Sequence, residues 1–148
     1  MPGVRYAYAG ERTIPARTVA AYRNTKYWVG GIEVRIGRRS RPMDGLLASY
    51  GVRQAVFITA YNPFSRVMPS GWNLRMQAAL MRTLRRYRIL IASGSWRRWS
   101  ESHVVVLGDP RPALRLMRLF RQNGIVIVRV RQNARLVIPY DRLGRTDT

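Results

Sequence analysis

Side chains that could bind a ligand gather in three short polar segments of the sequence, residues 61–70, 93–102 and 121–124. Amides, hydroxyls and guanidinium groups hydrogen-bond anions, and aromatic rings stack on flat groups or cations. The candidate side chains are Tyr61, Asn62, Ser65 and Arg66 in the first segment, Trp96, Arg97, Arg98, Trp99 and Glu101 in the second, and Arg121, Gln122 and Asn123 in the third. Asn73, in a helix predicted just after the first segment, joins them.

Residues suited to catalysis are scarce. The single histidine, His103, stands at the start of an apolar strand beside Glu101 and two serines. Residues so close along one strand rarely form a triad of nucleophile, base and acid, so we interpret His103 as a strand residue that bonds locally. Glu101 is the one carboxyl placed for acid–base work, and a salt bridge to Arg97 or Arg98 is the simpler account of it. We therefore assume no catalysis.

No cofactor or metal site is expected. The sequence contains no cysteine and one histidine, which leaves oxygen ligands that the surrounding arginines would disfavour for a cation. Neither of the glycine-rich patterns that cradle phosphates in nucleotide-binding loops occurs. The helix predicted to begin at Ser70 could still hold an anion at its N-terminus.

The charge balance predicts an anionic partner. The chain has 27 Lys+Arg against 7 Asp+Glu, and every basic residue except Lys26 is arginine. Arginine matches phosphate with a planar fork of donors and stacks on bases, which favours nucleic acid. Codon bias in the genome is the alternative explanation for the excess of arginine. Two predicted helices carry basic rows away from their apolar faces: Arg75, Arg82 and Arg86 on one, and Arg111, Arg115 and Arg118 on the other.

Length and composition predict one domain. The 148 residues, 47% of them hydrophobic, suffice for one core. We expect a flexible N-terminal arm at 1–12, a single α/β domain at 13–140 and a short polar tail at 141–148. No segment resembles a signal peptide or membrane span, so a soluble cytoplasmic protein is expected.

Hydrophobic periodicity and capping residues predict the elements in order. They are a helix at 15–23, a strand at 27–36 bent at Gly30 and Gly31, a helix at 42–50 between a Ser40 cap and Gly51, a strand at 54–60, a helix at 71–86 capped by Ser70, a strand at 87–93, a loop at 94–102, a strand at 103–107, a helix from Pro110 to Gly124 capped by Asp109, and a hairpin of strands at 125–130 and 134–140.

From residue 54 to residue 130 the predicted order is β-α-β-β-α-β, the ferredoxin-like split unit of an α+β fold. An extra helix, strand and helix precede this core, and a hairpin strand follows it. In this topology the three polar segments meet at one end of the sheet, which is a usual place for a ligand.

Several motifs occur in a characteristic order: FITAYNPFSR with Asn73 downstream, WSES followed by HVVVLG, and FRQNGIVIV at 120–128. In these motifs the chain resembles a bacterial family catalogued as domain of unknown function 3293, over roughly residues 18–138. The resemblance implies no activity, because none is established for the family. The chain departs from the family pattern at Tyr61, where Trp is common, and at Arg121, where Gly is common. Arg121 could fill or recharge a pocket.

Three functions follow from these patterns. The leading hypothesis is a binding domain for RNA or single-stranded nucleic acid, with arginines on phosphates and Trp96, Trp99 and Tyr61 stacked on bases. The second is a pocket for a small anionic metabolite or nucleotide, catalytic or not, lined by Asn62, Ser65, Asn73, Glu101, Gln122 and Asn123. The third is a docking subunit of a larger ribonucleoprotein or for an acidic partner.

Overall fold

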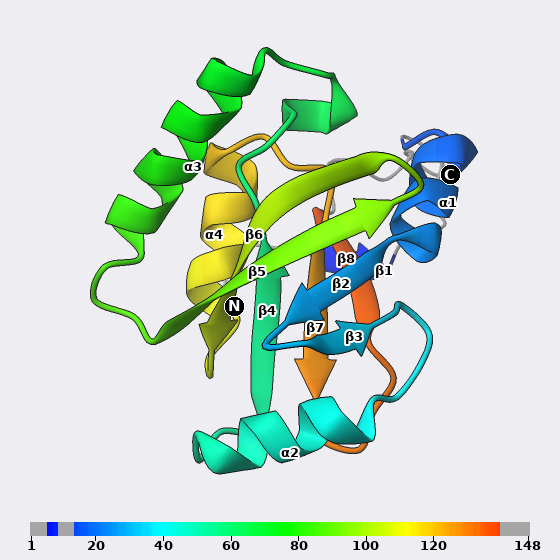
Figure 1. The fold of residues 1–148 in the computed structure, drawn as a ribbon, viewed down its shortest axis with the longest axis vertical. Coiled ribbons are helices and arrows are strands. Elements are labelled where there is room, and N and C mark those ends of the chain that lie inside the picture. Colours follow the sequence, from blue (N-terminus) through cyan, green and yellow to red (C-terminus); the bar gives the residue numbers. More distant parts are fainter. Residues whose placement is uncertain (1–5, 9–13, 140–148) are drawn as a thin grey trace, which may run out of the picture.

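The chain folds into one curled antiparallel sheet with four α-helices around it (Figure 1). The computed structural model describes residues 6–8 and 14–139. The helices are α1 (Ala16–Asn24), α2 (Arg41–Ser49), α3 (Ser70–Thr83) and α4 (Arg111–Leu119), with a short 3₁₀ turn η1 (Pro63–Ser65). The strands are β1 (Tyr6–Tyr8), β2 (Lys26–Val29), β3 (Ile32–Val34), β4 (Gln54–Ile58), β5 (Ile89–Trp96), β6 (Trp99–Leu107), β7 (Ile125–Arg129) and β8 (Arg135–Pro139). The predicted mixed α+β class is confirmed.

The strand order across the sheet is β1-β8-β7-β4-β6-β5-β2-β3, and every neighbouring pair is antiparallel. Strand β4 lies inside the sheet, between β6 and β7. Its residues 55–58 are all apolar and all buried, because helices cover one of its faces and the curl of the sheet encloses the other. This strand leads directly into the polar segment that begins at Tyr61.

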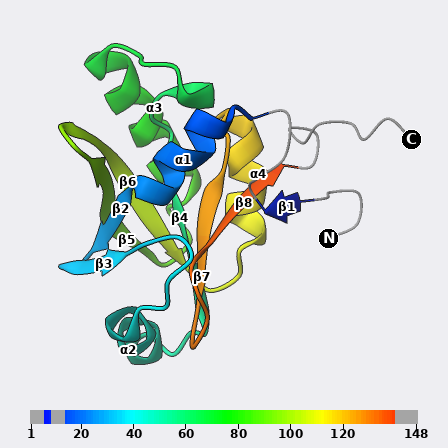
Figure 2. The ribbon, with the colours of Figure 1, turned by 90° about the vertical axis from the view of Figure 1, so that its right-hand side faces the viewer.

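The two faces of the sheet have separate cores. Helices α3 and α4 pack on one face through residues such as Leu80, Leu84 and Met117. The other face curls inward around a second core that contains Phe57 and Val105, with α2 below it and α1 beside its upper opening (Figure 2). The curl is nearly closed, because Ile36 forms a bridge to Ala134 just before β8.

Three segments differ from their sequence predictions. The helix predicted from Pro110 to Gly124 ends at Leu119, and Arg121 beyond it takes a left-handed φ of 54°. The strand predicted at 27–36 is a hairpin of β2 and β3, because Gly30 and Gly31 both take positive φ angles, 53° and 77°, and form a two-residue turn. The loop predicted at 94–102 is instead the outer half of the β5–β6 hairpin, which extends to a pair formed by Trp96 and Trp99. Its serines and glycine favour a loop locally, but strand pairing prevails.

Of the predicted helix ends, the Ser40 cap and the glycine at Gly51 are confirmed, and the Ser70 cap is wrong. Asp109 lies one residue before the capping position of α4, which Pro110 occupies. The Ser40 hydroxyl accepts a hydrogen bond from the Met43 backbone N–H at 3.1 Å, and Gly51 ends the segment with a φ of 68°. Asp109 accepts a bond from the Arg111 N–H at 3.0 Å. Ser70 is not a cap, because it is the first residue of α3 and follows Pro69.

The chain ends are described only in part. Within the predicted N-terminal arm the structure describes Tyr6–Tyr8, which pair with β8 as a short strand. The remaining residues of the arm and the predicted tail at 141–148 lie outside the described residues. In the described part of the chain, no helix combines the length and apolar character needed to cross a membrane.

Candidate functional site

A cavity of about 780 Å³ opens on the concave side of the sheet, at the end where β4 terminates. Its walls come from α1, the start of β2, the end of β4, the loop after Tyr61, the tip of the β5–β6 hairpin and residues 122–126. The three polar segments predicted to meet at one end of the sheet therefore all contribute to it. Nine of the predicted residues line it: Tyr61, Asn62, Ser65, Trp96, Arg97, Arg98, Trp99, Glu101 and Gln122.

The loop that follows β4 has an unusual backbone held by side-chain amides. Asn62, Phe64 and Ser65 all take left-handed conformations, with φ angles of 46°, 51° and 61°. Each such non-glycine residue costs about 1 kcal/mol or more unless its surroundings hold it. The Asn73 side chain accepts a bond from the Asn62 backbone N–H and donates one to the Asn62 side-chain oxygen, both at 2.9 Å. Asn73 is thus a clamp for the loop and does not line the cavity.

Two further amides fix the same loop from the other side. The Gln122 side chain donates to the Tyr61 carbonyl at 3.0 Å, and Asn123 donates to the Ser65 hydroxyl at 2.9 Å. Sequence analysis missed Gln77, whose oxygen accepts a bond from the Ala60 N–H at 2.9 Å. We infer that most of the predicted amide cluster positions the loop, while Asn62 alone contacts the carboxyl group described next.

Glu101 lies on the inner face of the hairpin and is 9% exposed. One carboxyl oxygen accepts a hydrogen bond from the Asn62 side chain at 2.8 Å. Burial raises the pKa of Glu101 to about 7, and the bond from Asn62 offsets this only in part. The salt bridge expected to Arg97 or Arg98 does not form. Within residues 14–139 the ion pairs are Arg39 with Asp44 and Arg111 with Asp109.

His103 lies two residues further along the same face of β6. Burial lowers the pKa of its imidazole to about 4, so the ring is neutral at physiological pH. Its Nδ1 lies 3.3 Å from the Glu101 carbonyl oxygen, which agrees with the predicted local bonding. The ring packs edge-on against Tyr27 at 5.5 Å and over Gly94 of β5. A Cβ at position 94 would lie 2.9 Å from the ring, so glycine makes room for the histidine.

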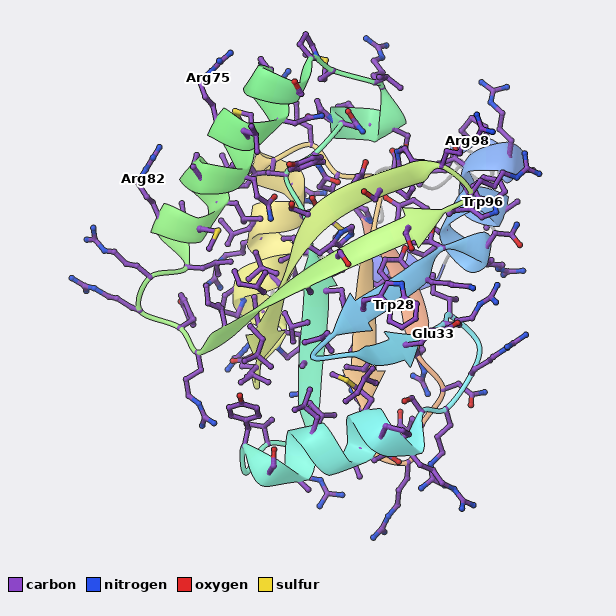
Figure 3. The ribbon with its side chains drawn as sticks, in the orientation of Figure 1. Trp28, Glu33, Arg75, Arg82, Trp96 and Arg98 are labelled. Atoms are coloured by element: carbon purple, nitrogen blue, oxygen red, sulfur yellow. The ribbon has the colours of Figure 1, made fainter. Side chains whose placement is uncertain are left out.

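The hairpin tip supplies aromatic and cationic groups at the mouth of the cavity. Trp96 and Trp99 face each other across the two strands beside a turn in which Arg97 has a φ of 56°. The Arg97 guanidinium lies over the Trp96 ring, 4.7 Å from its centroid. Trp99 is 39% exposed. Trp96 and Arg98 lie beside α1 in Figure 3.

Sequence analysis missed the contribution of α1 and β2 to the site. Arg17 and Tyr22 of α1 and Tyr27 of β2 line the cavity. Burial raises the pKa of both phenols, and the nearby Glu101 carboxylate adds to the effect, so both phenols keep their protons. No local pattern identifies these residues, since it is the curl of the sheet that brings α1 opposite the hairpin.

The remaining predicted residues lie outside the cavity walls. Arg66 and Arg121 are exposed, and Arg121 contributes a backbone carbonyl that accepts the Phe64 N–H at 2.7 Å. Arg121 therefore neither fills nor recharges the pocket. Both predicted basic rows are also exposed, although Arg86 lies in the turn after α3 and not on the helix. Arg75 and Arg82 point away from the molecule on the opposite side of the view from Trp96 and Arg98 (Figure 3). No cluster of three metal-ligating side chains occurs among the described residues.

Among the comparisons with known proteins, only a family model matches the chain. No curated protein and no solved structure matches the chain. The family resemblance seen in the sequence is confirmed over a shorter span than the motifs suggested, since residues 58–125 match the model of the family described as "Protein of unknown function (DUF3293)".

Proposed function

We propose that the cavity binds a small anionic ligand of the nucleotide class, with its flat group inside and its anion at the mouth. The observation that carries this proposal is the composition of the walls. Aromatic rings from α1, β2 and β4 line the interior, and Arg17, Arg97 and Arg98 stand at the rim. Pockets that combine an apolar lining with a few convergent polar groups and a carboxyl of shifted pKa are typical ligand sites.

The test is to titrate the protein with AMP and with GMP and to measure binding by calorimetry. A double variant, Arg17→Gln with Arg98→Gln, removes two rim charges and should weaken binding roughly tenfold, because both arginines are exposed and exposed ion pairs contribute up to about 1 kcal/mol each. The matched control, Arg82→Gln with Arg86→Gln, removes the same charge from exposed residues outside the cavity and should change affinity less than about twofold. Absence of binding to either nucleotide would overturn the proposal.

A second candidate is binding of RNA or single-stranded nucleic acid, favoured by a net charge of +20. The exposed arginines of α3 would contact phosphates and the hairpin tip would stack on bases. We rank it second because these two groups lie on opposite sides of the view in Figure 3, so one strand would have to wrap around the molecule to reach both. A role in a ribonucleoprotein would use the same surfaces.

We also propose that the segment from β4 to β7 is a ferredoxin-like split unit. Its sheet order, β7-β4-β6-β5, its antiparallel pairing and the position of α3 and α4 on one face support this classification. A cytoplasmic location and a bacterial source stay predictions.

A further inference from the structure

The inner wall of the cavity carries hydrogen-bond acceptors that have no partner in the described part of the chain. Asn62 donates one hydrogen bond to Oε1 of the Glu101 carboxyl, and this oxygen can accept a second. The second oxygen, Oε2, has no hydrogen-bond partner among residues 6–8 and 14–139. A buried acceptor left in this state is costly, and in a cavity wall it is available to a ligand.

His103 supplies a second acceptor. The Glu101 carbonyl can only accept, so the contact at 3.3 Å assigns the ring proton to Nδ1. Nε2 then carries a lone pair, and it too lacks a hydrogen-bond partner within the described residues. The phenol of Tyr22 is held by the Gly124 backbone and that of Tyr27 by Thr25. The second oxygen of Glu101 and Nε2 of His103 are thus open acceptors in this wall, and a ligand must meet these two atoms with donors.

The walls around these acceptors select a flat group. Tyr22, Tyr27 and Phe57 surround the inner end of the cavity, and Trp96 and Trp99 flank its mouth. A carboxylate binds best to two parallel N–H groups in one plane. The ring of guanine offers such a pair, whereas the corresponding edge of adenine offers one donor and one acceptor.

We propose that Glu101 is the specificity-determining residue of the cavity and reads a planar ligand edge with two adjacent N–H donors, of the guanine type, while the rim arginines hold the ligand phosphate. This inference rests on the proposed function. A site built around a buried acceptor discriminates strongly against a ligand that leaves the acceptor unpaired.

The experiment compares GMP with AMP, which carry the same phosphate. The intact protein should bind GMP at least tenfold more tightly than AMP. Glu101→Gln keeps the size of the side chain but replaces one acceptor with a donor, so it should weaken GMP binding at least tenfold and reduce the preference to within about threefold. Glu33→Gln, at an exposed carboxyl of β3, is the matched control and should leave the preference unchanged.

The pH dependence of the GMP/AMP preference is a second readout, and a merely structural role of Glu101 would not produce it. The groups around Glu101 are Asn62, the phenols of Tyr22 and Tyr27, His103 and the guanidinium groups of Arg17, Arg97 and Arg98. The Glu101 carboxyl, with a pKa of about 7, gains its charge between pH 5.5 and 8, while the His103 imidazole, with a pKa of about 4, stays neutral. The two nucleotides carry the same phosphate, whose titration cancels in their ratio, so the GMP/AMP preference should rise over that range and should not rise in the Gln variant.

The outcomes separate the two proposals. If both nucleotides bind with equal affinity, the role of Glu101 is overturned while the nucleotide pocket stands. If neither binds, the proposed function fails and this inference fails with it. The comparison of GMP with AMP on the unchanged protein needs no variant, so it is decisive even if Glu101→Gln lowers stability.

Discussion

At the scale of single residues, Glu101 and His103 lie two positions apart on β6 and titrate with opposite effects on stability. Burial raises the pKa of Glu101 to about 7 from an ordinary 4.5 and lowers that of His103 to about 4 from an ordinary 6.5. Between pH 4.5 and 7 the folded chain keeps a proton on Glu101 that the unfolded chain has lost, so the free energy of unfolding falls as pH rises. Between pH 4 and 6.5 the unfolded chain binds a proton at His103 that the folded chain lacks, so the free energy of unfolding rises.

Because the two effects oppose each other, removing the Glu101 carboxyl should reveal the effect of His103 on the pH profile of stability. In Glu101→Gln only His103 remains, and the free energy of unfolding should rise by about 3 kcal/mol between pH 4 and 6.5 relative to the profile of the unchanged protein. Urea unfolding at a series of pH values measures this. Glu33→Gln is the control and should give a profile parallel to that of the unchanged protein. A Glu101→Gln profile that is also parallel would show that Glu101 is not shifted in the folded state.

Arg121 matters through its backbone conformation and not through its charge. It follows α4 with a φ of 54°, and the Gln122 N–H bonds back to the Met117 carbonyl at 2.9 Å. This is the left-handed position at the end of a helix, which glycine occupies most readily. The glycine common there in the resembling family therefore has a backbone explanation, and the arginine is a tolerated replacement whose side chain extends into solvent.

At the scale of elements, the β5–β6 hairpin depends on Gly94. A methyl group there would lie 2.9 Å from His103 and 3.3 Å from Thr25, so Gly94→Ala should displace the imidazole from the cavity wall and cost about 1–3 kcal/mol of folding free energy. Thermal unfolding measures the loss, and GMP titration should show weaker binding.

Gly45→Ala is the matched control for this change. Gly45 lies inside α2, no atom comes within 4 Å of the position its Cβ would occupy, and alanine should stabilise the helix by about 0.5–1 kcal/mol. Equal destabilisation by both substitutions would contradict the assigned role of Gly94.

Much of this architecture follows from local sequence, and the exceptions have physical reasons. The helices at α1, α2 and α4 and the strand at β4 were predictable from periodicity and caps, as was the meeting of the three polar segments. The hairpin at 89–107 was not, because strand pairing overrides the loop-forming tendency of GSWRRWSES. The contribution of Tyr22 was not predictable either, since α1 reaches the cavity through long-range packing on Leu136 and Ile138.

At the scale of the whole molecule, the described surface carries little negative charge. Asp44 and Asp109 are paired with arginines, and Glu101 is buried. Among the described acids, only Glu33 is exposed with no hydrogen bond or ion pair from its side chain to another described residue. Polyanions should therefore bind somewhere on this surface at low salt, whether or not that binding is functional.

The salt dependence of RNA binding distinguishes a functional nucleic-acid surface from general attraction. If the second candidate function holds, replacing Arg75, Arg82 and Arg86 with glutamate should weaken binding of a labelled single-stranded RNA at least tenfold at 0.15 M salt and reduce the slope of log affinity against log salt. GMP binding to the cavity should be unchanged. If the triple variant binds RNA like the unchanged protein across the salt series, α3 and the turn after it are not part of a nucleic-acid surface.

The central position of β4 also has a consequence for the order of events during synthesis. Its partners are β6 and β7, and the pairing of Gln54 with Arg129 joins residues far apart in the chain. At a translation rate of about 5–20 residues per second, the apolar segment at 55–58 waits roughly 4 to 15 seconds before β7 has been made. Until then one edge of β4 is unpaired, which is the state that chaperones recognise and that aggregates most readily. The apolar strand that leads into the candidate site is thus exposed to failure while the chain is still incomplete.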